Sequence, residues 1–201
     1  GIYRPNKDAA LLLLSRVYLY QKKYDDVITV VDDLLKTTET EIIPYSTLEK
    51  FISSDDVVYK VYNPNNPGMI FSWGKLDVDA TGFGYDLMRH SKAFFCASSE
   101  LIGLYDEGND LRFSRYYDKY DFNNYDEGIF YVATKNYCKA STANEAYDQA
   151  LRLEEAYLNR AEAYIEKGEH ELGMDDVNAI RAERIKGCLL YTSPSPRDRT
   201  R

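Results

Sequence analysis

The stretch EEAYLNRAEAYIEKGE, from Glu154 to Glu169, predicts a helix that runs into a turn. Apolar residues recur along it at intervals of three and four, which places them on one buried face of a helix. That face comprises Leu153, Ala156, Tyr157, Ala161, Tyr164 and Ile165. Gly168 follows, and glycine tolerates the positive φ with which many helices end. A second periodic run at Gly173, Val177 and Ile180 comes next, so the pattern predicts a helical hairpin.

The beginning of the chain has the same construction. A first face at helical intervals comprises Ala10, Leu13, Leu14, Val17 and Tyr18. After the polar break QKK, a second face comprises Tyr24, Val27, Ile28, Val31, Leu34 and Leu35. Aligning Tyr18 with Tyr164 also aligns Lys22 with the turn residue Gly168. This spacing is typical of tetratricopeptide repeats, and the sequence therefore predicts a mainly α-helical fold built from hairpins.

The composition limits the classes of protein to which the chain can belong. It has 201 residues, 44% of them hydrophobic, which is enough for one domain with its own core. The net charge is −8 and no stripe of Lys and Arg occurs, so a nucleic-acid backbone would be repelled. No apolar run reaches the roughly 18 residues that a membrane-spanning helix needs. Tyrosine is abundant, with 19 residues against a single Trp, which suits half-exposed packing and stacking on sugar rings.

The segment CLLYTSPSPRDRTR, residues 188–201, has neither helical nor strand periodicity. Its first part, Cys188 to Asp198, back-translates to a run that resembles the transposase adapter used in sequencing-library preparation. We interpret this segment as an adapter-derived artefact tail rather than a natural disordered tail, and we set it apart from the fold. The body of the chain is then residues 1–187.

The segment between the hairpins breaks the helical pattern. It extends over about 38–148, between hairpins at about 7–37 and 151–186. The pattern predicts a short strand at Met69 to Trp73 and a short helix around Glu100 to Tyr105. The rest of this segment is rich in aromatic residues, and its pattern predicts mostly irregular structure. Long loops of this kind are commonly functional. A uniform solenoid would not carry such an insertion.

Four blocks of the sequence have the order and the residue patterns of one known family. They are NKDAALLLLSRVYLYQKKYDDVITVVDDLL, MIFSW, SSELIGLYDEGNDLRF and RLEEAYLNRAEAYIEKGEHELGMDDVNAIRAERI. The last block matches most specifically, at Arg152, Glu155, Leu158, Arg160, Ala161, Glu162, Ala163, Asp176, Asn178 and Arg181. Through these blocks, which span most of Asn6 to Ile185, the chain resembles the SusD/RagB family of Bacteroidetes outer-membrane lipoproteins.

The resemblance implies a SusD-like fold, in which tetratricopeptide-like hairpins hold out irregular loops as a ligand face. It also implies a lipoprotein at the cell surface that captures glycans or other nutrients for a TonB-dependent, SusC-like transporter of the outer membrane. Such a protein is not an enzyme and needs no cofactor. The chain departs from the family pattern because it has no lipobox cysteine, signal peptide or native C-terminal region, so the lipid anchor and part of the ligand face are expected outside it.

The residues themselves assemble no recognisable catalyst. His90 and His170 stand alone in the sequence. The motifs of serine hydrolases, zinc proteases and phosphate-binding loops do not occur. The sequence therefore predicts a protein without enzymatic activity.

Two acidic stretches carry carboxylates at spacings that partly match metal sites. In DVDATGFGYDLM, Asp77, Asp79 and Gly82 stand at the first, third and sixth positions of a calcium loop, but Met88 occupies the twelfth, where a bidentate Glu belongs. An ordinary Asp/Gly turn fits this stretch better. A solvated acidic loop likewise fits better than a cation site for the group Asp106, Glu107 and Asp110. We therefore predict no metal site.

Several charged residues of the matching blocks are expected to have structural roles. Asp110 and Arg112, in NDLRF, are expected to pair with neighbouring backbone or charge and so to fix their loop. Interhelix hydrogen bonds and surface pairs are expected from Arg160, Glu162, Asn178 and Arg181.

Capture of a sugar needs an exposed aromatic plane for C–H faces and nearby polar groups for hydroxyls. Trp73 is the leading candidate because it stands beside a strand end and a Gly-rich loop, and a buried structural Trp is the alternative. The candidate ligand-binding residues are Trp73, Tyr62, Asn65, Phe83 and Tyr85, with Asn63 nearby in sequence. An equally consistent second set comprises Tyr116, Tyr117, Tyr120, Phe122 and Tyr125 with Asn123 and Asn124. Binding loops vary in the family, so the resemblance assigns no ligand contact to any of them.

Three functional hypotheses follow from these patterns. The leading one is non-catalytic binding of a glycan or another nutrient at the cell surface. The second is a tetratricopeptide-type scaffold for protein–protein interaction, which predicts further uninterrupted hairpins ahead of Gly1. The third, a glycan-active enzyme, would need paired carboxylates across a cleft.

Overall fold

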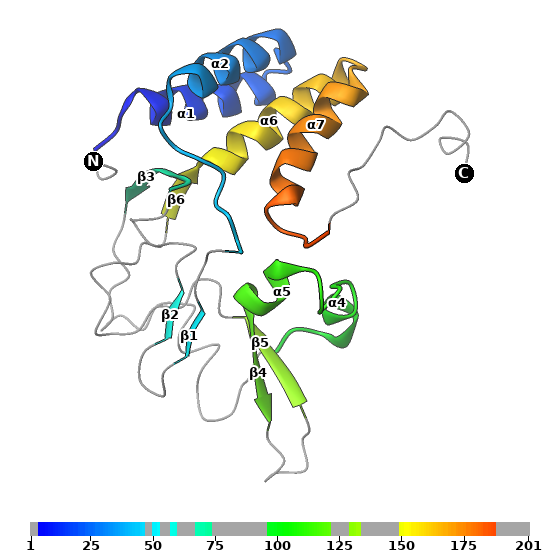
Figure 1. Cartoon of the computed structure of the whole chain (residues 1–201). Coiled ribbons are helices and arrows are strands. Elements are labelled where there is room, and N and C mark those ends of the chain that lie inside the picture. The colour runs from blue at the N-terminus through cyan, green and yellow to red at the C-terminus, as the bar shows by residue number, and fades with distance from the viewer. Residues whose placement is uncertain are drawn as a thin grey trace.

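The computed structural model describes residues 4–46, 50–52, 57–59, 67–73, 96–121, 129–133 and 149–187. The long helices gather at one end of the molecule with one two-stranded sheet beside them, and the short helices and the other two-stranded sheets lie at the other end (Figure 1). The predicted mainly helical architecture, built on helical hairpins, is confirmed.

The first hairpin consists of α1 (Lys7–Tyr20) and α2 (Tyr24–Thr37). Asn6 caps the start of α1, because its side-chain oxygen accepts a hydrogen bond from the backbone N–H of Ala9 (2.8 Å). In the turn between the helices, Lys22 has a φ of 57°, which is the left-handed region. This is the position that aligns with the turn glycine of the other hairpin, so both turns use the same backbone conformation.

Replacing Lys22 with glycine is expected to stabilise the protein by about 0.5–1 kcal/mol, because glycine has no Cβ to strain a left-handed backbone. Urea denaturation measures this change. Lys23→Gly is the matched control: Lys23 has a φ of −90°, so there the added chain freedom of glycine should destabilise by a similar amount. If both substitutions destabilise equally, the left-handed turn is not strained.

The second hairpin consists of α6 (Leu153–Glu166) and α7 (His170–Ala182). Gly168, in the turn, has a φ of +84°, as the sequence predicts for the residue that ends α6. Gly173 lets the two helices approach closely, because a Cβ there would lie 2.9 Å from the carbonyl oxygen of Ala161. A small residue is therefore required at this crossing.

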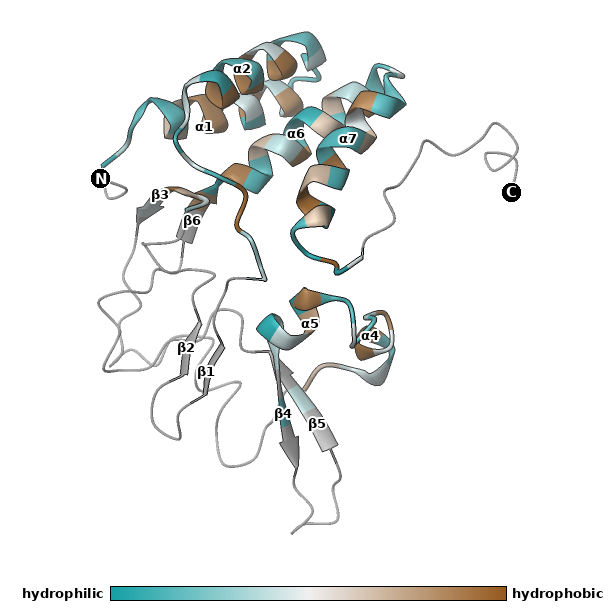
Figure 2. Cartoon of the chain, viewed as in Figure 1, coloured by the Kyte–Doolittle hydropathy of each residue, from teal (hydrophilic) through white to brown (hydrophobic). Residues whose placement is uncertain are grey.

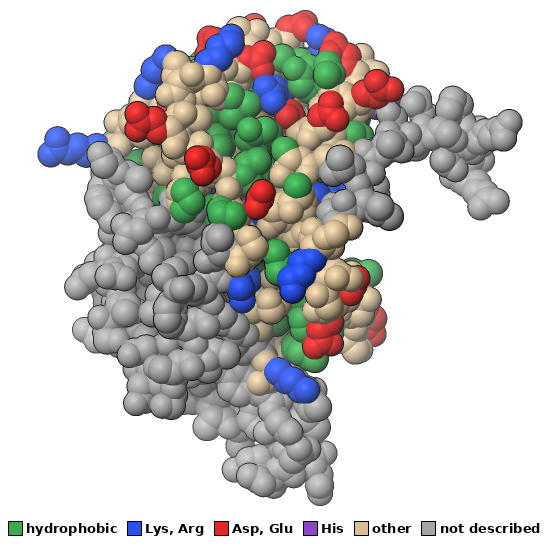
Figure 3. All heavy atoms as spheres, in the orientation of Figure 1, with side chains coloured by type: hydrophobic (Ala, Val, Ile, Leu, Met, Phe, Trp, Pro, Cys, Tyr) green, Lys and Arg blue, Asp and Glu red, His purple; other side chains and the backbone are tan. Residues whose placement is uncertain are grey.

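The core of the molecule forms where α6 packs against both helices of the first hairpin. Its buried members are Ala9, Leu12, Val27, Val31, Leu34, Ile70, Leu151, Leu153, Ala156 and Ala163. On the face shown in Figure 3, hydrophobic side chains gather in the middle of the helical part and charged side chains surround them. The two hairpins, far apart in sequence, thus share one core.

The buried face of α1 differs from the sequence prediction. The predicted face was Ala10, Leu13, Leu14, Val17 and Tyr18, whereas the buried residues of α1 are Ala9, Leu12 and Ser15. Leu13, Leu14 and Val17 are 44%, 37% and 47% exposed. Of the predicted face, Tyr18 does pack against the core. The prediction of the other four as core residues was therefore wrong.

The reason is that α1 is apolar around most of its circumference, so two stripes fit the same helical period (Figure 2). Polar contacts with α6 select the stripe that faces inward. Asn159 donates a hydrogen bond to the hydroxyl of the fully buried Ser15 (2.9 Å), and Arg16 pairs with Glu155. Hydrophobic periodicity carries no information about such partners.

Arg160 of α6 joins three helices. Its Nε and Nη2 atoms donate to Asp176 of α7 (2.9 and 2.7 Å), and Nη1 donates to Asp32 of α2 (2.5 Å). Hydrogen bonds from Arg160 to Asp176 raise the pKa of the guanidinium above its ordinary value, against the opposing effect of burial. The predicted interhelix role of Arg160 is confirmed. Arg181, by contrast, donates to Asn178 within α7 itself (3.4 Å).

A small sheet leads into the second hairpin. The strand β3 (Met69–Trp73) is confirmed, and it pairs antiparallel with β6 (Gln149–Arg152), a strand that the sequence analysis did not predict. The carbonyl of Gly68 accepts a hydrogen bond from the N–H of Leu153 (3.0 Å), which ties the start of β3 to the start of α6. The sheet therefore anchors an inner part of the long insertion, at β3, beside the point where the chain rejoins the helices.

The other described parts of the insertion are more regular than predicted. They are β1 (Lys50–Ile52), β2 (Val57–Tyr59), α4 (Ser99–Ile102), α5 (Leu111–Tyr116), β4 (Tyr117–Asp121) and β5 (Ile129–Ala133). The expected short helix near Glu100 corresponds to α4. The antiparallel hairpin of β4 and β5 replaces chain that was expected to be irregular, because its aromatic and β-branched residues favour strands once they have a partner.

Candidate ligand-binding surface

Most of the first predicted ligand-binding set falls outside the described residues. Tyr62, Asn65, Phe83 and Tyr85 belong to segments that the structure does not describe. Trp73 ends β3, and its backbone pairs with that of Gln149. The side chain of Trp73 is not among the described parts of the structure. The ligand role of this set stays a prediction.

The second predicted set is described at two positions, Tyr116 and Tyr117. Tyr116 ends α5 and Tyr117 begins β4, and the two rings have different neighbours. The Tyr116 ring contacts Tyr45 edge to face at 5.8 Å, whereas the Tyr117 ring contacts Tyr105 at 5.5 Å. Tyr120, Phe122, Tyr125, Asn123 and Asn124 have no described side chains.

Tyr117 belongs to a group of rings that we call the ring cluster, made up of Tyr105, Phe113, Tyr117 and Tyr131. Phe113 stands at its centre, with ring centroids 5.9, 6.0 and 5.2 Å from those of the three tyrosines. Phe113 is buried, and the tyrosines around it are half-buried. The cluster thus combines a fixed apolar centre with a rim of phenol groups that reach the surface.

A salt bridge holds the edge of the ring cluster. Arg112 donates from Nη2 to Asp110 (2.6 Å) and lies with its guanidinium carbon 5.5 Å from the centre of the Tyr105 ring. The buried Asp110 also accepts from the backbone N–H of Arg112 (3.0 Å), which caps α5. The prediction that Asp110 and Arg112 fix this loop is confirmed.

Two phenol groups at this end of the molecule, those of Tyr116 and Tyr117, have a raised pKa. Burial raises the pKa of Tyr117 to about 12, and the hydroxyl of Tyr105, 3.5 Å away, adds to that shift. Burial and the Tyr45 hydroxyl also raise the pKa of Tyr116 far above its ordinary value. Neutral phenols can both donate and accept hydrogen bonds, which is what a ligand rich in hydroxyl groups requires.

Two carboxylates of the acidic stretch before α5, those of Asp106 and Asp110, have partners within the protein. Asp106 accepts from the side-chain amide of Asn109 (2.8 Å) and from the N–H of Gly108 (3.2 Å). The Asn109 hydrogen bond lowers the pKa of Asp106. Asp110 is engaged by Arg112. Within the described parts of the chain, no group of three or more potential metal ligands comes together.

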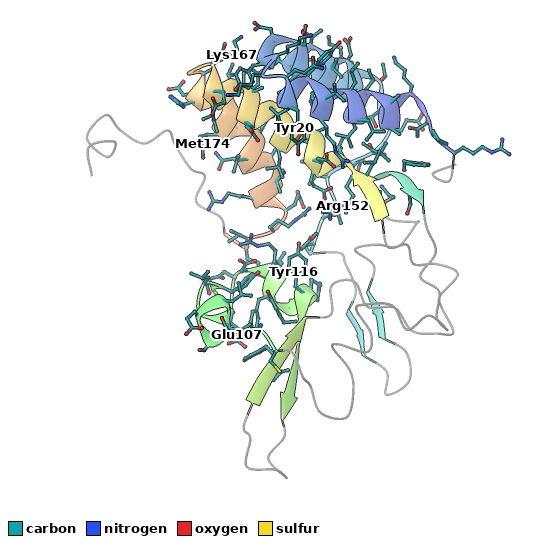
Figure 4. All side chains as sticks on the ribbon, turned by 180° about the vertical axis from the view of Figure 1, so that it is seen from behind. Tyr20, Glu107, Tyr116, Arg152, Lys167 and Met174 are labelled. Atoms are coloured by element: carbon teal, nitrogen blue, oxygen red, sulfur yellow. The ribbon has the colours of Figure 1, made fainter. Side chains whose placement is uncertain are left out.

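A buried polar group, here called the polar junction, attaches this end of the molecule to the helices. It comprises Arg184, Glu154, Ile43, Tyr45 and Tyr116. Arg184 donates to Glu154 (2.5 Å) and to the carbonyl of Ile43, and its guanidinium lies 3.6 Å from the centre of the Tyr45 ring. The hydroxyls of Tyr45 and Tyr116 are 2.6 Å apart. Figure 4 shows Tyr116 between the helical part and the β4–β5 hairpin.

The sequence analysis missed both the polar junction and the ring cluster as groups. Arg184 and Glu154 are 30 residues apart, and Tyr45 and Tyr116 are 71 apart, so no local spacing links them. For the ring cluster one signal was present: three of its members lie in Tyr105 to Tyr117, an aromatic-rich stretch whose first residue ended the predicted short helix.

No family model matches the sequence, and no curated protein matches it. Among solved structures, a SusD-like carbohydrate-binding protein from Bacteroides vulgatus matches with a TM-score of 0.66 and 17% identity over 98% of this chain and 41% of its own. A SusD superfamily protein from Bacteroides thetaiotaomicron matches with a TM-score of 0.66 and 20% identity, over 93% of this chain and 43% of its own. A SusD-like protein from Bacteroides fragilis matches with a TM-score of 0.59 and 24% identity, over 95% and 49%.

In the described part of the chain, no helix combines the length and apolar character needed to cross a membrane. The chain spans less than half the length of each of these three solved proteins, which cover nearly all of it. The chain therefore has the SusD-like fold over the part of those proteins that it matches.

Proposed function

We propose that the chain is part of a non-catalytic cell-surface protein that binds a glycan, or another nutrient, through its ring cluster and the neighbouring loops. The observation that carries the proposal is a set of half-buried phenol rings, fixed on a buried Phe113 and edged by the Arg112 guanidinium. Rings of this kind cover the C–H faces of sugars, while phenol and guanidinium groups meet the hydroxyls.

The proposal extends to the cellular setting that the family resemblance implies. The complete protein would be a lipoprotein on the outer membrane, attached through a lipid at its N-terminus. It would deliver its ligand to a TonB-dependent, SusC-like transporter. The similarity to a protein described as carbohydrate-binding supports a glycan as the ligand.

The test is calorimetric titration of the full-length protein with a panel of soluble polysaccharides, followed by the same titration of Tyr105→Ala. The substitution is expected to weaken binding about tenfold, the equivalent of roughly 1.4 kcal/mol, because it removes a ring from the rim of the cluster. Tyr20→Ala is the control, since Tyr20 is 92% exposed on α1, away from the cluster, and should bind normally.

Trp73→Ala separates the two predicted sites. If Trp73→Ala abolishes binding while Tyr105→Ala keeps it, the ligand binds near the end of β3 rather than at the ring cluster. If the wild-type protein binds no member of the panel and hydrolyses none, a glycan is not its ligand.

A further inference from the structure

Arg115, in the last turn of α5, is a half-buried cation without an anionic partner in the described part of the chain. No described group accepts a hydrogen bond from its buried Nε atom. Burial lowers the pKa of the guanidinium from its ordinary value, and no described carboxylate opposes that effect. Arginine nevertheless stays protonated in proteins. Arg115 therefore carries a positive charge that the surrounding fold leaves uncompensated.

Other arginines in comparable settings are paired. Each of the following lies within salt-bridge distance of at least one carboxylate: Arg16, Arg112, Arg160 and Arg184. Carboxylates are not scarce, because the chain has 33 Asp and Glu against 25 Lys and Arg. The C-terminal end of a helix attracts a cation, but at Arg115 it supplies no acceptor to the Nε atom. Because a partly desolvated charge without a partner is costly, such a group indicates a partner that binds from outside.

The short helix α5 places Arg115 beside the proposed ligand surface. Phe113, at the centre of the ring cluster, belongs to the same helix. Arg112 precedes Arg115 by three residues, and side chains at that spacing are neighbours on a helix, with Cβ atoms about 5–6 Å apart. The charge of Arg112 is already balanced by the buried Asp110, whereas that of Arg115 is open. On the face shown in Figure 3, Lys and Arg side chains gather around α5. A glycan that covers Tyr105 can therefore meet Arg115 with a neighbouring sugar unit.

We propose that Arg115 binds the anionic group of an acidic glycan, which is a carboxylate of a uronic acid or a sulfate ester. This inference rests on the proposed function, because it specifies the class of glycan that binds at the ring cluster and α5. The guanidinium is a planar fork of N–H donors, and its geometry matches the paired oxygens of a carboxylate or a sulfate. The bound anion compensates the charge of Arg115, while the rings of the cluster cover the C–H faces of the sugars.

The negative charge of the protein does not exclude such a ligand. The net charge is −8, but at physiological ionic strength the field of exposed charges fades over about 8 Å. A contact between an anion and a half-buried guanidinium is screened much less. Long-range repulsion therefore slows the approach of an acidic glycan without preventing this contact.

The test is calorimetric titration of the full-length protein with matched polysaccharides. Glucuronoxylan and polygalacturonate are titrated before and after reduction of their carboxyl groups, and carrageenan before and after desulfation. The wild-type protein is expected to bind at least one acidic form at least tenfold more tightly than its neutral form, and the pair that shows this preference identifies the anion. Arg115→Gln should remove the preference without weakening the binding of the neutral form. Lys119→Gln is the matched control, since Lys119 is an exposed cation on the neighbouring β4, and it should change each affinity less than twofold.

Equal affinity of the wild-type protein for acidic and neutral forms would overturn this inference and leave the proposed function intact, as would a preference that survives Arg115→Gln. Absence of binding to every form would overturn both. A second measurement needs no ligand: Arg115→Gln should not lower the Tm of the full-length protein, because it removes an unpaired charge. A fall of several degrees relative to Lys119→Gln would show that Arg115 pairs with a carboxylate of the protein itself, which also overturns the inference.

Discussion

Arg184→Met is expected to lower the free energy of unfolding by about 3–5 kcal/mol, the usual cost of removing one partner from a buried ion pair. The side chains of Arg184 and Glu154 are both 7% exposed. Without Arg184, Glu154 keeps a single hydrogen bond, from the N–H of Ile43 (3.3 Å), because its other oxygen has no partner among the described residues. A buried charge with one weak partner is strongly destabilising.

Urea denaturation measures the loss, and two further variants make the result interpretable. Lys36→Met breaks a pair with Asp33 whose side chains are 71% and 57% exposed, and it should change stability by less than about 0.5 kcal/mol. Arg184→Met combined with Glu154→Leu removes both charges and should recover most of the loss. A loss below about 1 kcal/mol for Arg184→Met alone would contradict the role of the polar junction.

Arg160→Met is expected to cost about 3 kcal/mol, because it leaves the carboxylate of Asp176 buried without its partner. The side chains of Arg160 and Asp176 are 16% and 7% exposed, and Arg160 also pairs with Asp32 of α2. One substitution thus breaks polar contacts from α6 to both α2 and α7. Thermal and urea unfolding should both show the loss when the helical signal is monitored by far-ultraviolet circular dichroism.

Lys167→Met is the matched control for Arg160→Met. Lys167 also links the second hairpin to α2, through Asp25 (2.6 Å), but the two side chains are 30% and 86% exposed. Solvent screens such a pair, so the expected loss of stability is much smaller than that of Arg160→Met. Equal losses for the two variants would mean that the burial of Arg160 is irrelevant to its contribution.

The sequence predicted the hairpins because their signals are local. The turn at Gly168 and the run Met69 to Trp73 each depend on neighbours a few residues away, and both appear as expected. The prediction of the inward face of α1 was wrong because the contacts that orient this helix are not local. Its orientation depends on Asn159, which is 144 residues from the Ser15 that it contacts.

The sequence predicted the residue types of the candidate site but not their arrangement. The abundance of tyrosine indicated rings for stacking, and Tyr117 was named among them. The way in which Tyr131 of β5 reaches Phe113, 5.2 Å away, depends on the pairing of β4 with β5, which residue composition does not specify. Likewise, the pairing of Arg112 with Asp110 is local and was predicted, whereas the Arg184 contacts are long-range and were not.

The separation between the two halves of the core has a consequence for synthesis on the ribosome. The first hairpin cannot complete its packing until α6 emerges, because Val27, Val31 and Leu34 share their core with residues of that helix. The 144 residues between Ser15 and Asn159 take roughly 7–30 s to translate at about 5–20 residues per second. For that interval the apolar faces of α1 and α2 lack their native partner, which makes the nascent N-terminal hairpin a natural client for chaperones.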